Sequence, residues 1–304
     1  MHVFLTGGTG FVGSYVLRAL LEAGHTVRCL MRDKAAPLAV EDTQIERVKG
    51  DVTSAKSLTG ALQGCEAVIH LVGIIEEQPG RGITFEALHT EGTRHVVAEA
   101  QQSEISTFIH MSANGARAEG VSGYQTSKWA AEELVRAAAF DRWTIFRPSI
   151  LFGDPGPDHP EFATQLVDTL IRPFPILPVF GDGQYRLQPI SVQEVAMAFV
   201  QALTNEAAWG RSFCAAGPDT FTYEETLDLL ARAAGLTPKP TVRQPLWLVR
   251  PALQLADPLG VLPISLDQFE MLIEGNTCDA SSFYQTFALT PVPFDTENLA
   301  YLRA

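Results

Sequence analysis

Two residues, Tyr124 and Lys128 in the stretch Tyr-Gln-Thr-Ser-Lys, give the first indication of the chemistry that this chain is able to perform. Residues four apart share one face of a helix, so the phenol and the ammonium group are expected to point into the same cleft. A nearby cation favours the phenolate and lowers the pKa of a tyrosine from its ordinary value of about 10. Such a tyrosine exchanges a proton with a substrate hydroxyl near neutral pH. The alternative is an ordinary pair on a helix surface, because this spacing is common.

A glycine-rich stretch near the start of the chain predicts a dinucleotide site. The apolar run 2–5 predicts a buried strand, and the residues from 11 onward predict an amphipathic helix. Glycines between them allow a tight turn and a close backbone approach, while the N–H groups and dipole of the helix favour a pyrophosphate. The alternative is a glycine-rich connection without a ligand. The candidate contacts are Gly7, Gly8, Thr9, Gly10, Phe11, Val12 and Gly13.

Strand and helix patterns alternate through the first half of the chain, which predicts an α/β fold with a doubly wound parallel sheet of the Rossmann type. Further strands are expected at 26–31, 45–48, 67–73, 107–111 and 143–146. His70 lies inside one of them and is expected to be a packed residue. Ligands of such sheets bind at the C-terminal ends of the strands. The expected contacts to the nicotinamide half of a cofactor are therefore Leu71, Val72, Gly73 and Met111.

The end of the second strand should select between NAD and NADP, because it meets the adenosine ribose. An acidic residue there would bind the 2′-hydroxyl of NAD, but the sequence continues Met31-Arg32-Asp33-Lys34. Arg32 and Lys34 are able to pair with a 2′-phosphate, so we expect NADP(H). Asp33 leaves NAD(H) open, and the alternative is that both cations are solvated loop charges.

The spacing Gly7-x-x-Gly10-x-x-Gly13, together with Tyr124-x-x-x-Lys128, resembles that of the short-chain dehydrogenase/reductase superfamily. Asp51-Val52 is similar to the acidic–apolar pair that lies beside the adenine in the extended branch of nucleotide-sugar epimerases and dehydratases. The run 147–153 resembles the R-P-x-x-V-Y-G segment of that branch, whose backbone meets the nicotinamide. The resemblance implies cofactor contacts at Asp51, Val52, Pro148 and Ile150, and at the catalytic pair Tyr124 and Lys128.

Two positions depart from the superfamily pattern. Its catalytic serine or threonine is usually the second of two small polar residues after the fifth strand, whereas here Ser112 is followed by Ala113. Ser112 is expected to take the role from one residue earlier. His89 stands where the resemblance places a catalytic asparagine. These departures fit an atypical group, similar to the bacterial relatives of the nucleotide-binding accessory subunit of respiratory complex I, and that resemblance implies tightly held NADP(H).

Beyond residue 153 the alternation breaks and prolines interrupt the chain. We expect a dinucleotide-binding domain over 1–153 and a smaller, interleaved C-terminal lobe over 154–304. The resemblance implies that about 187–205 returns to the main domain. The region 245–274 is unusually apolar, and we expect short helices that close the lobe. The alternative is an exposed patch that docks to a membrane or a protein. Burial of Trp247, Leu248, Leu255 and Leu262 would favour the helices that close the lobe, and their exposure would favour the docking patch.

Composition limits the partners. The 304 residues carry a formal charge of −13, which argues against nucleic acid and against electrostatic docking to an anionic membrane. The four cysteines lack metal-site spacing, so free thiols in a reducing compartment and no metal are expected. No apolar run reaches the roughly 20 residues of a membrane span. We expect a cytoplasmic protein, with peripheral membrane contact as the alternative.

Two functions of different classes fit these patterns. The first is an NADP(H)-dependent oxidoreductase or nucleotide-sugar epimerase that acts on a small molecule through Tyr124 and Lys128. The second is a non-catalytic NADPH-binding accessory protein that docks to a membrane complex. A nucleotide sugar would need a diphosphate site, for which the candidates are Arg172, Arg186 and Arg211.

Overall fold

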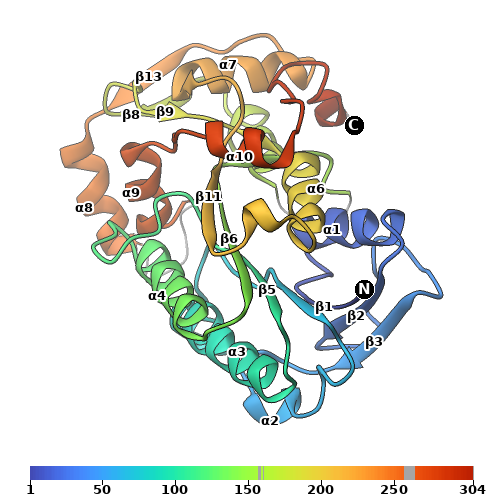
Figure 1. The fold of residues 1–304 in the computed structure, drawn as a ribbon. Helices are drawn as coiled ribbons and strands as arrows, with labels where there is room; N and C mark the ends of the chain where they lie inside the picture. Colours follow the sequence, from blue (N-terminus) through green and yellow to red (C-terminus); the bar gives the residue numbers. More distant parts are fainter. Residues whose placement is uncertain (157–158, 160, 257–263, 304) are drawn as a thin grey trace.

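The computed structural model describes residues 1–156, 159, 161–256 and 264–303 (Figure 1). Its main domain is built on a seven-stranded sheet in the order β3-β2-β1-β4-β5-β6-β11, in which every neighbouring pair is parallel. The chain reverses its direction of winding between β1 and β4, so the predicted doubly wound sheet is confirmed. The strands are β1 (His2–Thr6), β2 (Thr26–Met31), β3 (Ile45–Lys49), β4 (Ala67–His70), β5 (Thr107–Met111), β6 (Arg142–Pro148) and β11 (Arg211–Ala215).

Helices cover both faces of this sheet (Figure 1). On β1, Val3 and Leu5 pack with one helical layer and Phe4 packs with the other, which explains why the strand is apolar at successive positions. One layer consists of α1 (Phe11–Glu22), α6 (Val192–Ala202) and α10 (Ser281–Phe287). The other consists of α2 (Ala55–Leu58), the π-helical turn η2 (Glu86–Glu91), α3 (Gly92–Gln102) and α4 (Gly123–Ala137).

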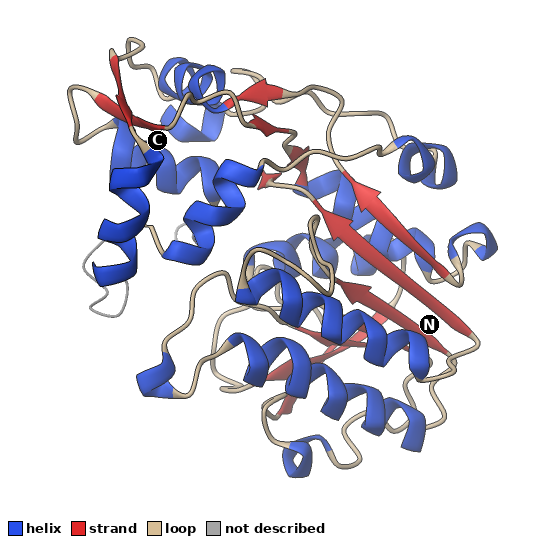
Figure 2. Ribbon diagram, turned by 90° about the vertical axis from the view of Figure 1, so that its left-hand side faces the viewer, coloured by secondary structure: helices blue, strands red, loops and turns tan. Residues whose placement is uncertain are grey.

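The smaller lobe lies beyond the C-terminal ends of the main strands (Figure 2). Phe152, Tyr223 and Phe294 belong to its own buried cluster. Its strands pair two by two: β7 (Leu151–Phe152) with β10 (Ile190–Ser191), β8 (Leu177–Phe180) with β13 (Thr241–Gln244), and β9 (Arg186–Leu187) with β12 (Phe221–Thr222). Its helices are α5 (Phe162–Leu166), η3 (Val167–Ile171), α7 (Tyr223–Ala233), α8 (Leu246–Ala256), α9 (Leu266–Glu274) and η6 (Ala300–Arg303); the short turns η1 (Pro79–Arg81) and η4 (Glu206–Ala208) lie outside it.

The segment that returns to the main domain is longer than expected. Helix α6, which begins with a capping box between Ser191 and Glu194, packs on α1. Beyond residue 205, however, β11 adds a strand beside β6, and α10 packs against β11. Aromatic rings of these late elements surround Phe146 on the sheet, among them Phe213 and Phe287. The apolar residues of these elements looked like lobe residues in the sequence, because nothing local distinguishes the two cores.

The expectation of four free cysteines is wrong for one pair. Cys214 on β11 and Cys278 form a disulfide, with their Cα atoms 6.4 Å apart. Because the two cysteines are 64 residues apart, the sequence does not reveal that the chain before α10 runs beside β11. Cys29 and Cys65 are free, and burial raises the pKa of their thiols to about 12 and about 11.

The apolar region after residue 245 is only partly core. On α8, Trp247, Leu248 and Leu255 are 77%, 52% and 79% exposed, so the core interpretation is wrong for these three side chains. Leu253 on the same helix is buried. Leu262 lies outside the described residues. Within the described chain, no helix combines the length and the apolar character that crossing a membrane requires.

Candidate functional site

The loop between β1 and α1 depends on two glycines, Gly7 and Gly13, at which a side chain would be strained or would clash. Gly7 has a φ of 76°, in the left-handed region. A Cβ on Gly13 would lie 2.0 Å from the carbonyl oxygen of Gly7, so the first turn of α1 packs directly on the loop. A Cβ on Gly7 would come within 3.2 Å of Leu71 and Val72 at the end of β4. The loop is therefore pressed between the helix and the neighbouring strand.

The N-terminus of α1 faces the ligand edge of the sheet with no side chain capping it. Its N-cap is Gly10, which is extended and supplies no hydrogen-bond acceptor from a side chain. Gly10 donates its N–H to the carbonyl of Gly7 at 3.0 Å, which closes the turn. The N–H groups at Phe11 and Val12 belong to the first turn, where α-helical amides lack an intrahelical partner. These features, with the space that only glycine leaves, fit an anionic pyrophosphate.

The residues expected at the adenosine end follow β2 and β3. Arg32 and Lys34 are exposed, and neither side chain bonds to another residue in the described part of the chain. Asp33 instead accepts the N–H of Ala35 at 2.9 Å, which shapes the turn. After β3, Asp51 accepts the N–H of Thr53 at 2.9 Å and Val52 is buried. Two cations and one acidic–apolar pair therefore lie at neighbouring strand ends.

Lys128 brings the ends of β4 and β5 together. Its Nζ is buried and donates to the carbonyl of Met111 at 3.1 Å. A Cβ on Gly73 would lie 2.8 Å from the same nitrogen, so a larger residue there would displace the lysine ammonium group. Tyr124 lies one turn earlier on α4, half-buried, with its ring edge-on to Phe85 at 5.7 Å. Lys128, Gly73 and Met111 therefore meet at one point, with Tyr124 one helical turn away.

His89 is a fixed, neutral part of this cluster. Its Nε2 accepts the N–H of Ile74 at 3.0 Å, so its proton must be on Nδ1. Nδ1 donates to Ser127 Oγ at 2.9 Å, and Ser127 in turn donates to the carbonyl of Tyr124 at 2.9 Å. Burial, together with the charge of Lys128, lowers the pKa of His89 to about 2. The ring therefore holds the loop after β4 against α4 and carries no charge at neutral pH.

The pKa values of the pair differ from the sequence expectation. Burial raises the pKa of Tyr124 to about 12, and no lowering by Lys128 accompanies it. Burial also lowers the pKa of Lys128 to about 8, against the opposing charge of Glu132. The predicted lowering of the Tyr124 pKa is wrong for this structure, in which burial shifts this pKa upward. Tyr124 is consequently a protonated donor at neutral pH.

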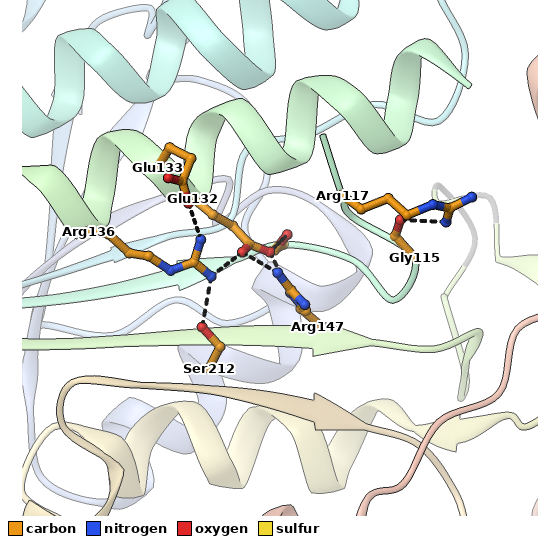
Figure 3. Close-up of polar contacts among 8 residues, drawn as sticks. Gly115, Arg117, Glu132, Glu133, Arg136, Arg147 and Ser212 are labelled. Carbon is orange, nitrogen blue, oxygen red and sulfur yellow. Dashed lines mark hydrogen bonds and ion pairs between the residues drawn. The ribbon is translucent and has the colours of Figure 1, made fainter. Parts of the chain in front are cut away.

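Ser112 is placed at the end of β5, but its hydroxyl is engaged elsewhere. It donates to Glu132 on α4 at 2.5 Å, and both residues are buried. Arg147 donates two hydrogen bonds to the same carboxylate, from Nε at 2.7 Å and from a terminal nitrogen at 2.6 Å. Arg136 also pairs with it (Figure 3). The ring of Trp129 lies beneath both guanidinium groups. This network locks α4 to the ends of β5 and β6.

Sequence reasoning missed Glu132, although a signal for it exists. Glu132 follows Tyr124 by eight residues and Lys128 by four, so all three lie along one helix face. Arg147 lies at a strand end, and a cation in that position is expected to pair with an acidic residue. His70 was predicted correctly as a packed residue: it bonds Thr6 Oγ1 at 2.7 Å, and burial lowers its pKa to about 3.

The candidate diphosphate arginines do not converge. Arg172 donates to the carbonyl of Leu302. Arg211 is the first residue of β11, at the end of the strand opposite the ligand edge, and donates to the carbonyl of Ala207. Arg186 lies on β9, exposed. A cavity of about 280 Å³ in the smaller lobe is lined by other residues, namely Phe180, Gly181, Asp182, Gln184, Tyr185, Leu246 and Ile273.

Pro148 and Ile150 occupy the expected segment after β6. Pro148 is buried, and its carbonyl accepts the N–H of Asn114 at 2.8 Å. Ile150 is half-buried, and its carbonyl accepts the N–H of Ile190. The segment therefore connects the end of β5 with the lobe, beside the ligand edge of the sheet.

The fold and this edge define a nicotinamide-dinucleotide-binding protein of the extended short-chain dehydrogenase type. The chain belongs to the NAD dependent epimerase/dehydratase family, whose model matches residues 3–213. Among similar proteins is the ceramide reductase of Caulobacter vibrioides, 30% identical over 78% of this chain and 72% of that protein. The mitochondrial NADH-ubiquinone oxidoreductase 40 kDa subunit of Neurospora crassa is 26% identical over 74% of this chain, but the match spans only 58% of that subunit.

Solved structures share the whole fold. MoeE5 in complex with UDP-glucose and NAD superposes with a TM-score of 0.75 at 19% identity, covering 100% of this chain and 97% of that one. The UDP-glucuronic acid 4-epimerase of Bacillus cereus, in complex with UDP-glucuronic acid and NAD, gives 0.75 at 17% identity, covering 100% and 98%. Together with the family match and the reductase relative, these similarities support an NAD(P)-dependent enzyme.

Proposed function

We propose that this protein is an NADP(H)-dependent oxidoreductase that interconverts a carbonyl group and a hydroxyl group on a small molecule. The observation that carries the proposal is the meeting of Lys128, Gly73 and the Met111 carbonyl at the ends of β4 and β5, with Tyr124 one helical turn away. The nicotinamide, when bound, supplies or accepts the hydride. The remaining chemistry, proton transfer and orientation, belongs to the side chains of this chain.

In the proposed reaction Tyr124 transfers the proton to and from the substrate oxygen. Its phenol, protonated at neutral pH, gives a proton to the carbonyl oxygen during reduction, and the phenolate takes one from the hydroxyl during oxidation. Lys128 holds the cofactor ribose through its buried ammonium group. His89 keeps the loop after β4 and the helix α4 in register through Ile74 and Ser127. Because the Ser112 hydroxyl is bound by Glu132, the proposal assigns the proton step to Tyr124 without it.

The proposed cofactor contacts follow the strand ends in order. The loop 7–13 holds the pyrophosphate, since its glycines leave the space and α1 offers its amides. Arg32 and Lys34, both without a partner among the described residues, bind the 2′-phosphate and so favour NADP(H) over NAD(H). Asp51 and Val52 lie beside the adenine. The nicotinamide half meets Leu71, Val72, Gly73, Met111, Pro148 and Ile150.

We further propose an apolar alcohol or ketone as the substrate class. The Tyr124 ring contacts Phe85 and the uncharged ring of His89, and Ile75 and Val121 are 50% and 46% exposed on the loops after β4 and before α4. The three arginines considered for a diphosphate do not converge on this edge, which disfavours a nucleotide sugar. Relatives named for ceramide, a farnesyl dihydroquinoline oxide and 3 beta-hydroxysteroids support an apolar substrate.

The test compares wild type with Tyr124→Phe in a screen of long-chain ketones, prenyl alcohols, steroid alcohols and UDP-glucose, with NADPH consumption or formation as the readout. The matched control is Tyr284→Phe, on α10 in the opposite helical layer. Tyr124→Phe should lower turnover by about 10²–10⁴ and leave NADPH affinity unchanged. Full activity in Tyr124→Phe would remove the tyrosine from the proton step.

A second function rests on different observations. The Neurospora relative and an Arabidopsis thaliana relative, 27% identical over 74% of this chain, are named as subunits of NADH dehydrogenases. Replacement of the tetrad asparagine by His89, and the engagement of Ser112, fit a protein that holds NADPH without turnover. Tight NADPH binding with no hydride transfer to any substrate of the screen would support this accessory role over the enzymatic one.

A further inference from the structure

Helix α8 presents an apolar outer face that the chain itself leaves uncovered. Trp247 and Leu255 are 77% and 79% exposed, and Leu248 is 52% exposed. The opposite face is used for packing: Leu253 is buried, and Leu246 and Val249 are half-buried. A helix that is apolar on both faces normally has both faces covered, by protein or by lipid. The outer face of α8 therefore lacks a partner in the monomer.

The charges around this face are compensated. Between residues 241 and 256 the ionisable side chains are Arg243 and Arg250. Arg250 pairs with Glu270 on α9 at 2.6 Å, and Arg243 lies 3.6 Å from Glu224 on α7. Both cations of this segment are thus paired with a carboxylate, in a protein whose formal charge is −13. This balance suits the neutral headgroup region of a zwitterionic bilayer and disfavours an anionic surface or a charged peptide.

The residue types also suit a bilayer surface. A tryptophan ring is amphipathic and concentrates at the membrane–water interface, while leucine side chains enter the hydrocarbon. Trp247 and Leu248 lie at the start of α8, and Leu255 lies two turns later. A helix that rests in the plane of the interface contributes this kind of stripe.

α8 is connected to the catalytic pair through a single helix, α9. The Arg250–Glu270 ion pair joins α8 to α9. At its C-terminal end α9 reaches α4, where Glu274 accepts from Gln125 at 2.7 Å. At its N-terminal end, Asp267 lies 3.4 Å from where a Cβ on Gly123 would sit, next to Tyr124. Figure 2 shows α8 and α9 on the side of the smaller lobe that overhangs α4.

We propose that the outer face of α8 docks onto the surface of a zwitterionic phospholipid bilayer, with Trp247, Leu248 and Leu255 inserted. Docking there brings the N-terminal end of α4 close to the membrane, so an apolar substrate reaches Tyr124 without crossing water. This second step rests on the proposed oxidoreductase function, whereas the docking itself does not.

The experiment measures binding of the full chain to phosphatidylcholine vesicles by flotation, without cofactor or substrate. Tryptophan emission is followed in parallel, because Trp247 is the most exposed of the four tryptophans and its emission should shift to the blue on insertion. The test variant is Trp247→Ser/Leu255→Ser. The control is Met197→Ser, since Met197 is 45% exposed on α6, in the other part of the molecule.

The double variant should bind vesicles at least about tenfold more weakly than wild type, because each inserted side chain buries its apolar surface in the bilayer. The control should bind like wild type, and phosphatidylglycerol vesicles should bind no better than phosphatidylcholine. Absence of wild-type flotation, or equal binding by the double variant, overturns the docking proposal. Vesicle binding in a protein without turnover would support docking while rejecting the enzymatic function, so the two failures are distinguishable.

Discussion

Glu132→Gln is expected to be the most destabilising conservative change near the site. The carboxylate is fully buried and accepts hydrogen bonds from Ser112, Arg147 and Arg136. Glutamine keeps the shape but offers one acceptor oxygen, and its NH₂ would face a donor. Removing one partner of a buried ion pair costs about 3–5 kcal/mol. Because the two guanidinium groups are 25% and 26% exposed and solvent screens them, we expect the lower end, about 3 kcal/mol.

Urea unfolding followed by circular dichroism measures this loss as a lower midpoint at unchanged slope. Glu133→Gln is the matched control. Glu133 is the next residue and pairs with the same Arg136, but it is 53% exposed, so its loss should cost at most about 1 kcal/mol. Equal costs for the two variants, or a cost below about 1 kcal/mol for Glu132→Gln, would refute the claim that this network anchors α4.

Three further predictions concern protons and the disulfide. Because burial raises the pKa of Tyr124 to about 12 and lowers that of Lys128 to about 8, alcohol oxidation should accelerate about tenfold per pH unit between pH 6 and 8, where Lys128 keeps its charge, while ketone reduction stays flat over this range; a plateau at pH 6 in a steady-state assay would contradict this. Burial raises the folded-state pKa of Glu161 from 4.5 to about 7, so its contribution to stability is complete below pH 4.5 and is lost as the pH rises through 7. Calorimetric scans should show this trend in wild type, and a Glu161→Gln protein with the same trend would exclude Glu161 as its source. Reduction of the Cys214–Cys278 bond should lower stability by about 2–4 kcal/mol in wild type, and dithiothreitol should leave the stability of Cys278→Ser unchanged.

The sequence predicted the main sheet because its signals are local. Apolar runs at β1 and β4 and the glycine spacing after β1 each reflect a constraint that acts within a few residues. Tyr124 and Lys128 were likewise predicted from a four-residue spacing on one helix. In the structure Lys128 lies beside Gly73 and Met111, at the ends of β4 and β5.

The sequence could not predict features that depend on contacts between distant segments. Ser112 gives its hydroxyl to Glu132, which lies twenty residues away, and the disulfide joins residues 64 apart. The pKa of Tyr124 was predicted in the wrong direction because burial, which raises this pKa, depends on the packed structure. The apolar pattern of α8 is visible in the sequence, but the sequence does not show which of its apolar side chains are buried and which are exposed.

The measurement that tests the account most directly is a calorimetric titration of the purified protein with NADPH and with NADH, in wild type and in Arg32→Ala. Arg232→Ala is the control, because Arg232 is also exposed but lies on α7 in the smaller lobe, away from the predicted site. The account predicts that wild type and the control bind NADPH more tightly than NADH, and that Arg32→Ala loses about 1.5–3 kcal/mol toward NADPH only. Equal affinities for the two cofactors would contradict the role of Arg32, and binding of neither would contradict the site itself.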